Sequence, residues 1–270
     1  MKEADELPVT SSVPPVLPGD QESLFRDVLS IFEDRGIPFA VSGAFALQQH
    51  TGICRFTKDL DIFLSPEVAR DGLALLEEKG YECEVCDPVW LAKAHRNGYF
   101  VDLITGMSNG VMTVDESWIA RSYPATVLGI RTKVLAPEEL IASKLFVTRR
   151  ERFDGADIVH IIYALRGQLE WNRILELAGA NWEMVLWALV LYRYVYPAGS
   201  DYVPSAIWED LLSRFVREIR LPNPSAKFRG SLIDDKMFAI DVEEWGLDDM
   251  LTESQARARK IRSQPKLRTA

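Results

Sequence analysis

Three acidic residues in two short apolar segments carry the strongest chemical signal in the sequence. Asp59 and Asp61 lie two residues apart in the segment KDLDIFL, and Asp102 lies in the segment FVDLI. Successive side chains of a strand point to opposite faces, so Asp59 and Asp61 share one face while the leucine between them faces the core. Neighbouring carboxylates repel each other, and a divalent cation with oxygen ligands is the natural charge to lie between them. The three acids therefore predict a metal site for phosphoryl chemistry.

The residues around these acids suit a nucleotide with a triphosphate group. Gly43 lets the backbone approach a ligand closely and Ala44 is still small, and both open a helix expected at 44–50. The exposed amides at the start of a helix favour phosphate oxygens. Arg55 and Lys58 flank the acids in sequence and can complement the remaining triphosphate charge.

The elements that must position these residues alternate between helices and strands up to residue 135. Hydrophobic periodicity predicts helices at 21–35, 44–50 and 65–79. Strands are expected at 39–42, 59–64, 81–86, 100–105, 125–130 and 131–135. From residue 137 onward the periodicity is helical, over 137–152, 154–167, 170–179, 181–196 and 204–219.

These elements predict an α/β (α+β) fold, in which a mixed sheet with flanking helices is followed by a helical C-terminal portion. We expect a disordered lead-in over 1–19, an α/β domain over 20–135, a helical region over 136–221, and an extended amphipathic segment with a basic tail over 222–270. The tail is a solvated segment in the simpler interpretation. In the alternative, it is a basic arm that raises the affinity for a nucleic acid.

The composition indicates a soluble protein of the cytoplasm. The 270 residues are 47% hydrophobic and 26% charged, which suits a globular protein with a sizeable core. A formal net charge of −9 argues against a protein that coats nucleic acid with its whole surface. Three cysteines make no disulfide framework and suit a reducing compartment. The N-terminus lacks the pattern of a secretory signal, and we expect no membrane partner.

The stretch VSGAFALQQHTGICRFTKDLDIFL resembles the signature of the nucleotidyltransferase superfamily that includes DNA polymerase beta. It is most similar to the bacterial AbiEii-type or MenT-type branch, which has a glycine turn, an Arg-x-Thr-x-Asp-x-Asp run, a later strand aspartate and a helical segment with a lysine and an Asp-x-x-Asp pair. Here these motifs follow in the same order over residues 37–165.

The resemblance implies roles for individual residues. Asp59 and Asp61 would bind Mg²⁺, with two ions expected and Mn²⁺ as an alternative. Asp102 would complete the metal site and help to activate the acceptor hydroxyl. Lys144 would reach the triphosphate or the acceptor, and Asp157 would help to orient Lys144. The residues implied near the nucleotide phosphates are Gly43, Ala44 and Thr57.

The expected reaction transfers a nucleoside monophosphate from an NTP to an acceptor hydroxyl and releases pyrophosphate. The likeness to the toxin branch makes RNA, including the 3′ end of tRNA, one acceptor, and it implies a cognate antitoxin as a partner. A small molecule, as in antibiotic-modifying relatives, is the alternative acceptor, and an acidic protein favours a cationic one. A catalytically inactive relative that binds a nucleotide or a partner protein is the third interpretation, and Ala44, in place of a second glycine, is the main residue in its favour.

Overall fold

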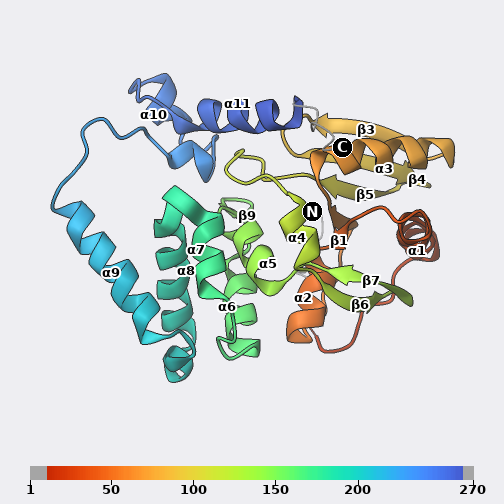
Figure 1. Ribbon diagram of the computed structural model, residues 1–270, viewed down its shortest axis with the longest axis horizontal. Coiled ribbons are helices and arrows are strands. Elements are labelled where there is room, and N and C mark those ends of the chain that lie inside the picture. Colours follow the sequence, from red (N-terminus) through yellow and green to blue (C-terminus); the bar gives the residue numbers. More distant parts are fainter. Residues whose placement is uncertain (1–10, 264–270) are drawn as a thin grey trace, which may run out of the picture. The chain divides into compact units, whose positions relative to one another are not determined.

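The computed structural model describes residues 11–263, which divide into two compact units. The first unit comprises residues 11–105 and 114–136, and the second comprises residues 106–113 and 137–263. The first unit contains the large sheet, and the second is mostly helical (Figure 1). The first ten residues of the lead-in expected over 1–19, and the end of the basic tail over 264–270, lie outside the described residues.

Within residues 11–263, seven strands form the mixed sheet of the first unit, in the order β3-β4-β5-β2-β1-β7-β6. The pairs β2–β5 and β1–β7 are parallel, and the other neighbouring pairs are antiparallel. The bounds are β1 Ala40–Val41, β2 Asp59–Phe63, β3 Glu82–Asp87, β4 Leu91–Arg96, β5 Tyr99–Ile104, β6 Tyr123–Val127 and β7 Ile130–Val134. The mixed sheet and its flanking helices confirm the expected fold class.

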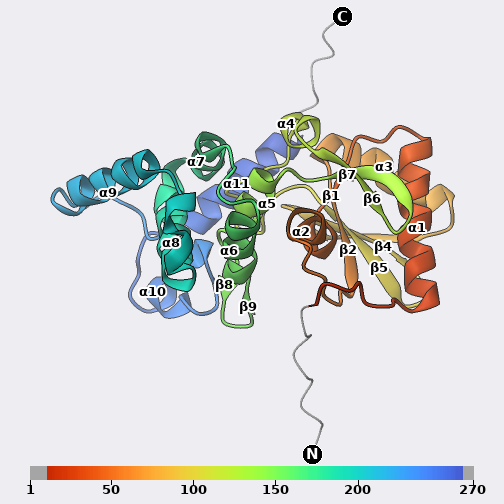
Figure 2. The same ribbon diagram turned by 90° about the horizontal axis from the view of Figure 1, so that it is seen from below.

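Helices cover both faces of this sheet (Figure 2). α1 (Gly19–Asp34) and α3 (Pro66–Glu78) pack on one face, where Phe32 of α1 lies between Gly72 of α3 and the apolar side of the sheet. α2 (Gly43–Thr51) begins on the opposite face, because its first residue adjoins the side chain of Asp61. These three helices confirm the predicted ones to within two residues at each end. The short helix α4 (Glu116–Ala120) completes the unit.

The second unit is built from α5 Pro137–Lys144, α6 Gly155–Ala164, α7 Trp171–Ala178, α8 Trp182–Val195, α9 Ser205–Ile219, α10 Ala239–Glu243 and α11 Met250–Ser263. The helix predicted over 137–152 is wrong beyond Lys144. The strands β8 (Thr148–Arg149) and β9 (Arg152–Phe153) form a hairpin there instead. The hairpin turns the chain back so that Asp154 meets Lys144, and this ion pair outweighs the helical periodicity of the segment.

One stretch of the second unit, Trp171–Val195, is long and apolar enough to cross a membrane by length and composition. It is not a single straight helix, because α7 ends at Ala178 and Gly179 adopts φ 54° and ψ −122° before α8 begins. α7 and α8 also contact each other within the unit. The stretch is therefore a bent pair of packed helices.

Candidate active site

The carboxylates of Asp59, Asp61 and Asp102 form one cluster on the face of the sheet where α2 begins. Each residue offers one oxygen atom, and these atoms lie within 4.8 Å of one another. The strand register explains the cluster, because Asp61 is directly opposite Asp102 across the parallel pair β2–β5. Asp59 lies two residues before Asp61 and therefore on the same face. The alternate residues of β2, Leu60 and Ile62, are fully buried on the other face, as the alternation predicts.

This donor set fits a divalent cation that prefers oxygen ligands. Asp102 is buried, with 8% of its surface exposed, while Asp59 and Asp61 are partly buried. Burial raises the pKa of Asp102 above its ordinary value; Lys93 opposes this shift, and the charge of Asp59 adds to it. A cation at the cluster would offset both the cost of burying the negative charge and the repulsion between the carboxylates. The three convergent carboxylates therefore suit a metal site.

Thr57 and Gly43 lie directly beside the carboxylates of Asp59 and Asp61. The Thr57 hydroxyl lies 2.9 Å from Oδ1 of Asp59, within hydrogen-bonding distance. Gly43, at the start of α2, has φ +58°, and a methyl group at this position would lie 1.9 Å from Oδ2 of Asp61. The backbone N–H of Ser42 also donates to the Asp61 carbonyl oxygen at 2.8 Å. The turn before α2 therefore requires glycine both for its left-handed backbone and for the space that Asp61 occupies.

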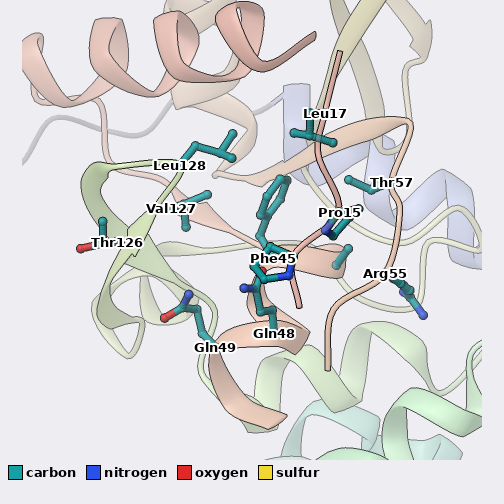
Figure 3. A pocket seen from close by; sticks show the side chains of 12 residues that line it. Pro15, Leu17, Phe45, Gln48, Gln49, Arg55, Thr57, Thr126, Val127 and Leu128 are labelled. Atoms are coloured by element: carbon teal, nitrogen blue, oxygen red, sulfur yellow. The ribbon is translucent and has the colours of Figure 1, made fainter. Parts of the chain in front are cut away.

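A pocket of about 210 Å³ lies along α2 (Figure 3). Its lining includes Ala44 and Thr57. Ala44 follows Gly43 in the chain, and the Thr57 hydroxyl hydrogen-bonds Asp59, so both lining residues lie next to the acid cluster. The rest comes from α2, the chain before α1, the loop at Arg55, and the end of β6 with the residue that follows it. The structure therefore brings three of the residues predicted near the nucleotide together at one pocket, namely Ala44, Arg55 and Thr57. Lys58, the last residue before β2, is exposed to solvent.

Lys93 of β4 belongs to the site and was not predicted from the sequence. Its Nζ lies 2.5 Å from Oδ1 of Asp102 and 3.6 Å from the centroid of the Phe100 ring. Strand β4 was missed because its inward residues are Ala92 and Ala94, and alanine is depleted in strands. The alternation of these buried alanines with polar residues was the signal that could have identified the strand.

In the second unit, Lys144 and Asp157 form a buried ion-pair cluster with Asp154. The Nζ atom of Lys144 lies 2.7 Å from Oδ2 of Asp154 and 2.7 Å from Oδ2 of Asp157. The three residues are only 3%, 6% and 3% exposed, in the order Lys144, Asp154 and Asp157. Arg152 also pairs with Asp154, at 3.0 Å. The cluster shows Asp157 holding the Lys144 ammonium, while the expected reach of Lys144 to a triphosphate stays a prediction.

Acid should destabilise the protein through Asp154. Burial by itself raises the pKa of this carboxyl, but Lys144 and Arg152 outweigh burial and lower the pKa from 3.8 to about 2. The unfolded chain therefore takes up the proton first, so the stabilisation, on the order of 2 kcal/mol, is present above pH 4 and is lost as the pH falls from 4 to 2. Urea unfolding at several pH values measures the free energy of unfolding. Between pH 4 and pH 2 this free energy should fall less for Asp154→Asn than for the wild type. The same pH slope in both proteins would contradict this assignment.

The chain matches a family model described as "Nucleotidyl transferase of unknown function (DUF2204)" over residues 21–183, which is more than half of its length. No protein among the curated sequences matches the chain.

Several solved structures are similar to the chain. One is the antibiotic-resistance factor ANT(2'')-Ia, with 16% identity, coverage of 65% of this chain and 97% of that chain, and a TM-score of 0.44. Another is an antigenic nucleotidyltransferase-like protein from Paracoccidioides brasiliensis, with 15% identity, coverage of 75% and 100%, and a TM-score of 0.43. A third is the lincosamide antibiotic adenylyltransferase LnuA, with 16% identity, coverage of 53% and 95%, and a TM-score of 0.37. TM-scores this low carry no inference about the substrate.

Proposed function

Because the chain belongs to the DUF2204 family of nucleotidyl transferases, we propose that it transfers a nucleoside monophosphate from an NTP to an acceptor hydroxyl and releases pyrophosphate. The observation that supports this reaction most is the cluster of Asp59, Asp61 and Asp102 beside the start of α2. Nucleotidyl transfer needs oxygen ligands for cations and a place for a triphosphate. The three carboxylates would supply the ligands, and the start of the helix would favour the phosphates.

The proposed resident ion is Mg²⁺, bound by Asp59, Asp61 and Asp102, with two ions in the complete site and Mn²⁺ as a substitute. When bound, the metal would polarise the phosphoryl oxygens and lower the pKa of the attacking hydroxyl. The Thr57 hydroxyl, 2.9 Å from Oδ1 of Asp59, would hold that carboxylate toward the ion, and Gly43 leaves the space that the Asp61 carboxylate occupies.

The nucleotide would be positioned by residues of the first unit. The amides of Gly43 and Ala44 open α2, and the partial positive charge of a helix N-terminus attracts phosphate oxygens. Arg55 lines the pocket beside Thr57, and Lys58 lies next to Asp59 in the chain. Both would complement triphosphate charge that the metal leaves uncompensated.

The acceptor hydroxyl would be activated by Asp102, the carboxylate that completes the metal site directly opposite Asp61. For Lys144 we propose the role that the family resemblance implies, a contact with the triphosphate or the acceptor. Asp157 would orient Lys144 through their 2.7 Å ion pair.

For the acceptor we propose RNA, including the 3′ end of tRNA, on the resemblance of the 37–165 motifs to the AbiEii-type or MenT-type branch. The same resemblance supports an antitoxin protein as a partner, and the odd number of cysteines supports the cytoplasm as the location. A cationic small molecule is the second candidate, because the net charge of −9 would favour such a substrate over a polyanion.

The test incubates the full chain with Mg²⁺ and each NTP labelled at its α-phosphate, together with total RNA or with cationic small molecules. We expect label in RNA, and none when Asp61→Asn replaces the wild type. Label in small molecules alone would move the assignment to the second candidate. If the wild type shows neither transfer nor Mg²⁺-dependent NTP binding, the chain is an inactive relative and the proposed reaction is wrong.

A further inference from the structure

A row of charged side chains continues from the acid cluster across the sheet. Strand pairing places Asp61 opposite Asp102, Asp102 opposite Lys93, and Lys93 opposite Glu84. The row therefore crosses the four neighbouring strands β2, β5, β4 and β3 on one face of the sheet. Lys93 therefore lies between two acids, Asp102 on β5 and Glu84 on β3. Its Nζ atom contacts Oδ1 of Asp102 at 2.5 Å.

Building on the metal site of the proposed function, we infer that Lys93 is a positioning residue that occupies Asp102 until a divalent cation binds. A cation and the Lys93 ammonium would compete for the same carboxylate, and their like charges would repel each other at close range. Glu84 is the acceptor for the displaced ammonium, because it lies directly opposite Lys93 on the outer strand. Side chains in such antiparallel pairs have Cβ atoms about 5 Å apart, well within the reach of a lysine.

The surroundings of Lys93 favour a short movement between two partners. Its side chain is 19% exposed and lies over the Phe100 ring, which attracts a cation through its π face. The ring would therefore support the ammonium while the flexible stem turns from one carboxylate to the other. Glu84 is 59% exposed, so its carboxylate has room to turn toward Lys93. Its Oε1 atom lies 3.0 Å from Nε2 of His95 and 3.4 Å from Sγ of Cys86.

A purely structural salt bridge makes a different prediction. If Lys93 only neutralised a buried acid, Glu84 would affect the metal site through its charge alone, and it would do so equally with or without Lys93. If Glu84 receives the displaced ammonium, its effect on metal binding must disappear when Lys93 is absent. A double-mutant cycle separates these two cases.

The test titrates Mn²⁺ into the full chain without nucleotide and follows the free ion by electron paramagnetic resonance. Lys93→Met keeps the apolar stem and removes the ammonium, so we expect Mn²⁺ affinity to rise by about 10-fold, the change that about 1.4 kcal/mol gives. Glu84→Gln should weaken binding several-fold, roughly 3-fold or more, in the wild-type background and leave it unchanged in the Lys93→Met background. Lys93→Arg keeps the positive charge, so its Mn²⁺ affinity should be no higher than that of the wild type.

Two matched controls remove the effect of charge alone. Lys133→Met removes an exposed lysine of β7 in the same sheet, and Glu82→Gln removes an acid on the same face of β3. Both should change affinity less than Lys93→Met and Glu84→Gln do. Equal effects of Glu84→Gln in the two backgrounds would overturn the role of Lys93 and leave the metal site standing. Absence of Mn²⁺ binding in the wild type would remove the metal site of the proposed function and this inference together.

Discussion

Replacing Gly43 by alanine is expected to reduce nucleotidyl transfer at least about 100-fold, because it moves a metal ligand. The added methyl group would lie 1.9 Å from Oδ2 and 2.9 Å from Cγ of Asp61, so the carboxylate must leave its place in the cluster. The backbone at Gly43 has φ +58°, where a residue with a Cβ atom is strained by about 1–2 kcal/mol. Turnover, Mn²⁺ affinity and melting temperature should therefore all fall.

Gly52 offers a matched control for this substitution. It caps the other end of α2 with φ +73°, and a Cβ atom there would meet nothing within 4 Å. Gly52→Ala should lower the melting temperature through backbone strain and leave turnover near the wild-type value. If Gly43→Ala behaved like Gly52→Ala in both measurements, the position of Asp61 would not matter for the reaction.

Replacing Lys144 by alanine is expected to destabilise the protein by about 3–5 kcal/mol, the usual result of breaking a buried ion pair from one side. Lys144 contacts both Asp154 and Asp157 at 2.7 Å, and its side chain is only 4% exposed. Without it, Asp157 would keep a buried charge that has lost its ammonium partner, while Asp154 would retain Arg152. Urea unfolding followed by circular dichroism measures the change.

The control for this substitution is Lys236→Ala, because Lys236 is an exposed lysine of the same unit. Surface substitutions of this kind usually change stability by less than about 0.5 kcal/mol. A loss below about 1 kcal/mol for Lys144→Ala would show that the buried cluster contributes little to the fold. In that case Lys144 would serve the function of the protein and not its stability.

The period of two in β2 was enough to predict which residues face the core and that Asp59 and Asp61 share a face. Helix bounds in the first unit were also predictable, because glycines and prolines mark the ends of the apolar stripes. Asp102 was grouped with Asp59 and Asp61 because it too lies in an apolar strand segment, but its place directly opposite Asp61 is known only from the structure. Local sequence contains no information on which distant strand pairs with β2, since that pairing depends on how the whole sheet assembles.

Two features could not be predicted because tertiary contacts outweigh local preference. Strand β4 has alanines at its buried positions, so Lys93 was not placed beside Asp102. The helical pattern after Lys144 is interrupted because the ion pair with Asp154 requires the β8–β9 hairpin. Residues 106–113 belong to the helical unit for a similar reason: Asn109 is buried and donates to the Leu232 carbonyl oxygen, 123 positions away in the chain.

We expect the cluster of Asp59, Asp61 and Asp102 to be the place where nucleotidyl transfer occurs. The most direct measurement is the single-turnover rate of α-phosphate transfer by the wild type and by Asp61→Asn, with Asp71→Asn, an exposed aspartate of α3, as the control. We predict a loss of at least about 100-fold for Asp61→Asn at an unchanged melting temperature, and no loss for Asp71→Asn. Transfer by Asp61→Asn at the wild-type rate would contradict the account, because the reaction would then take place at another site.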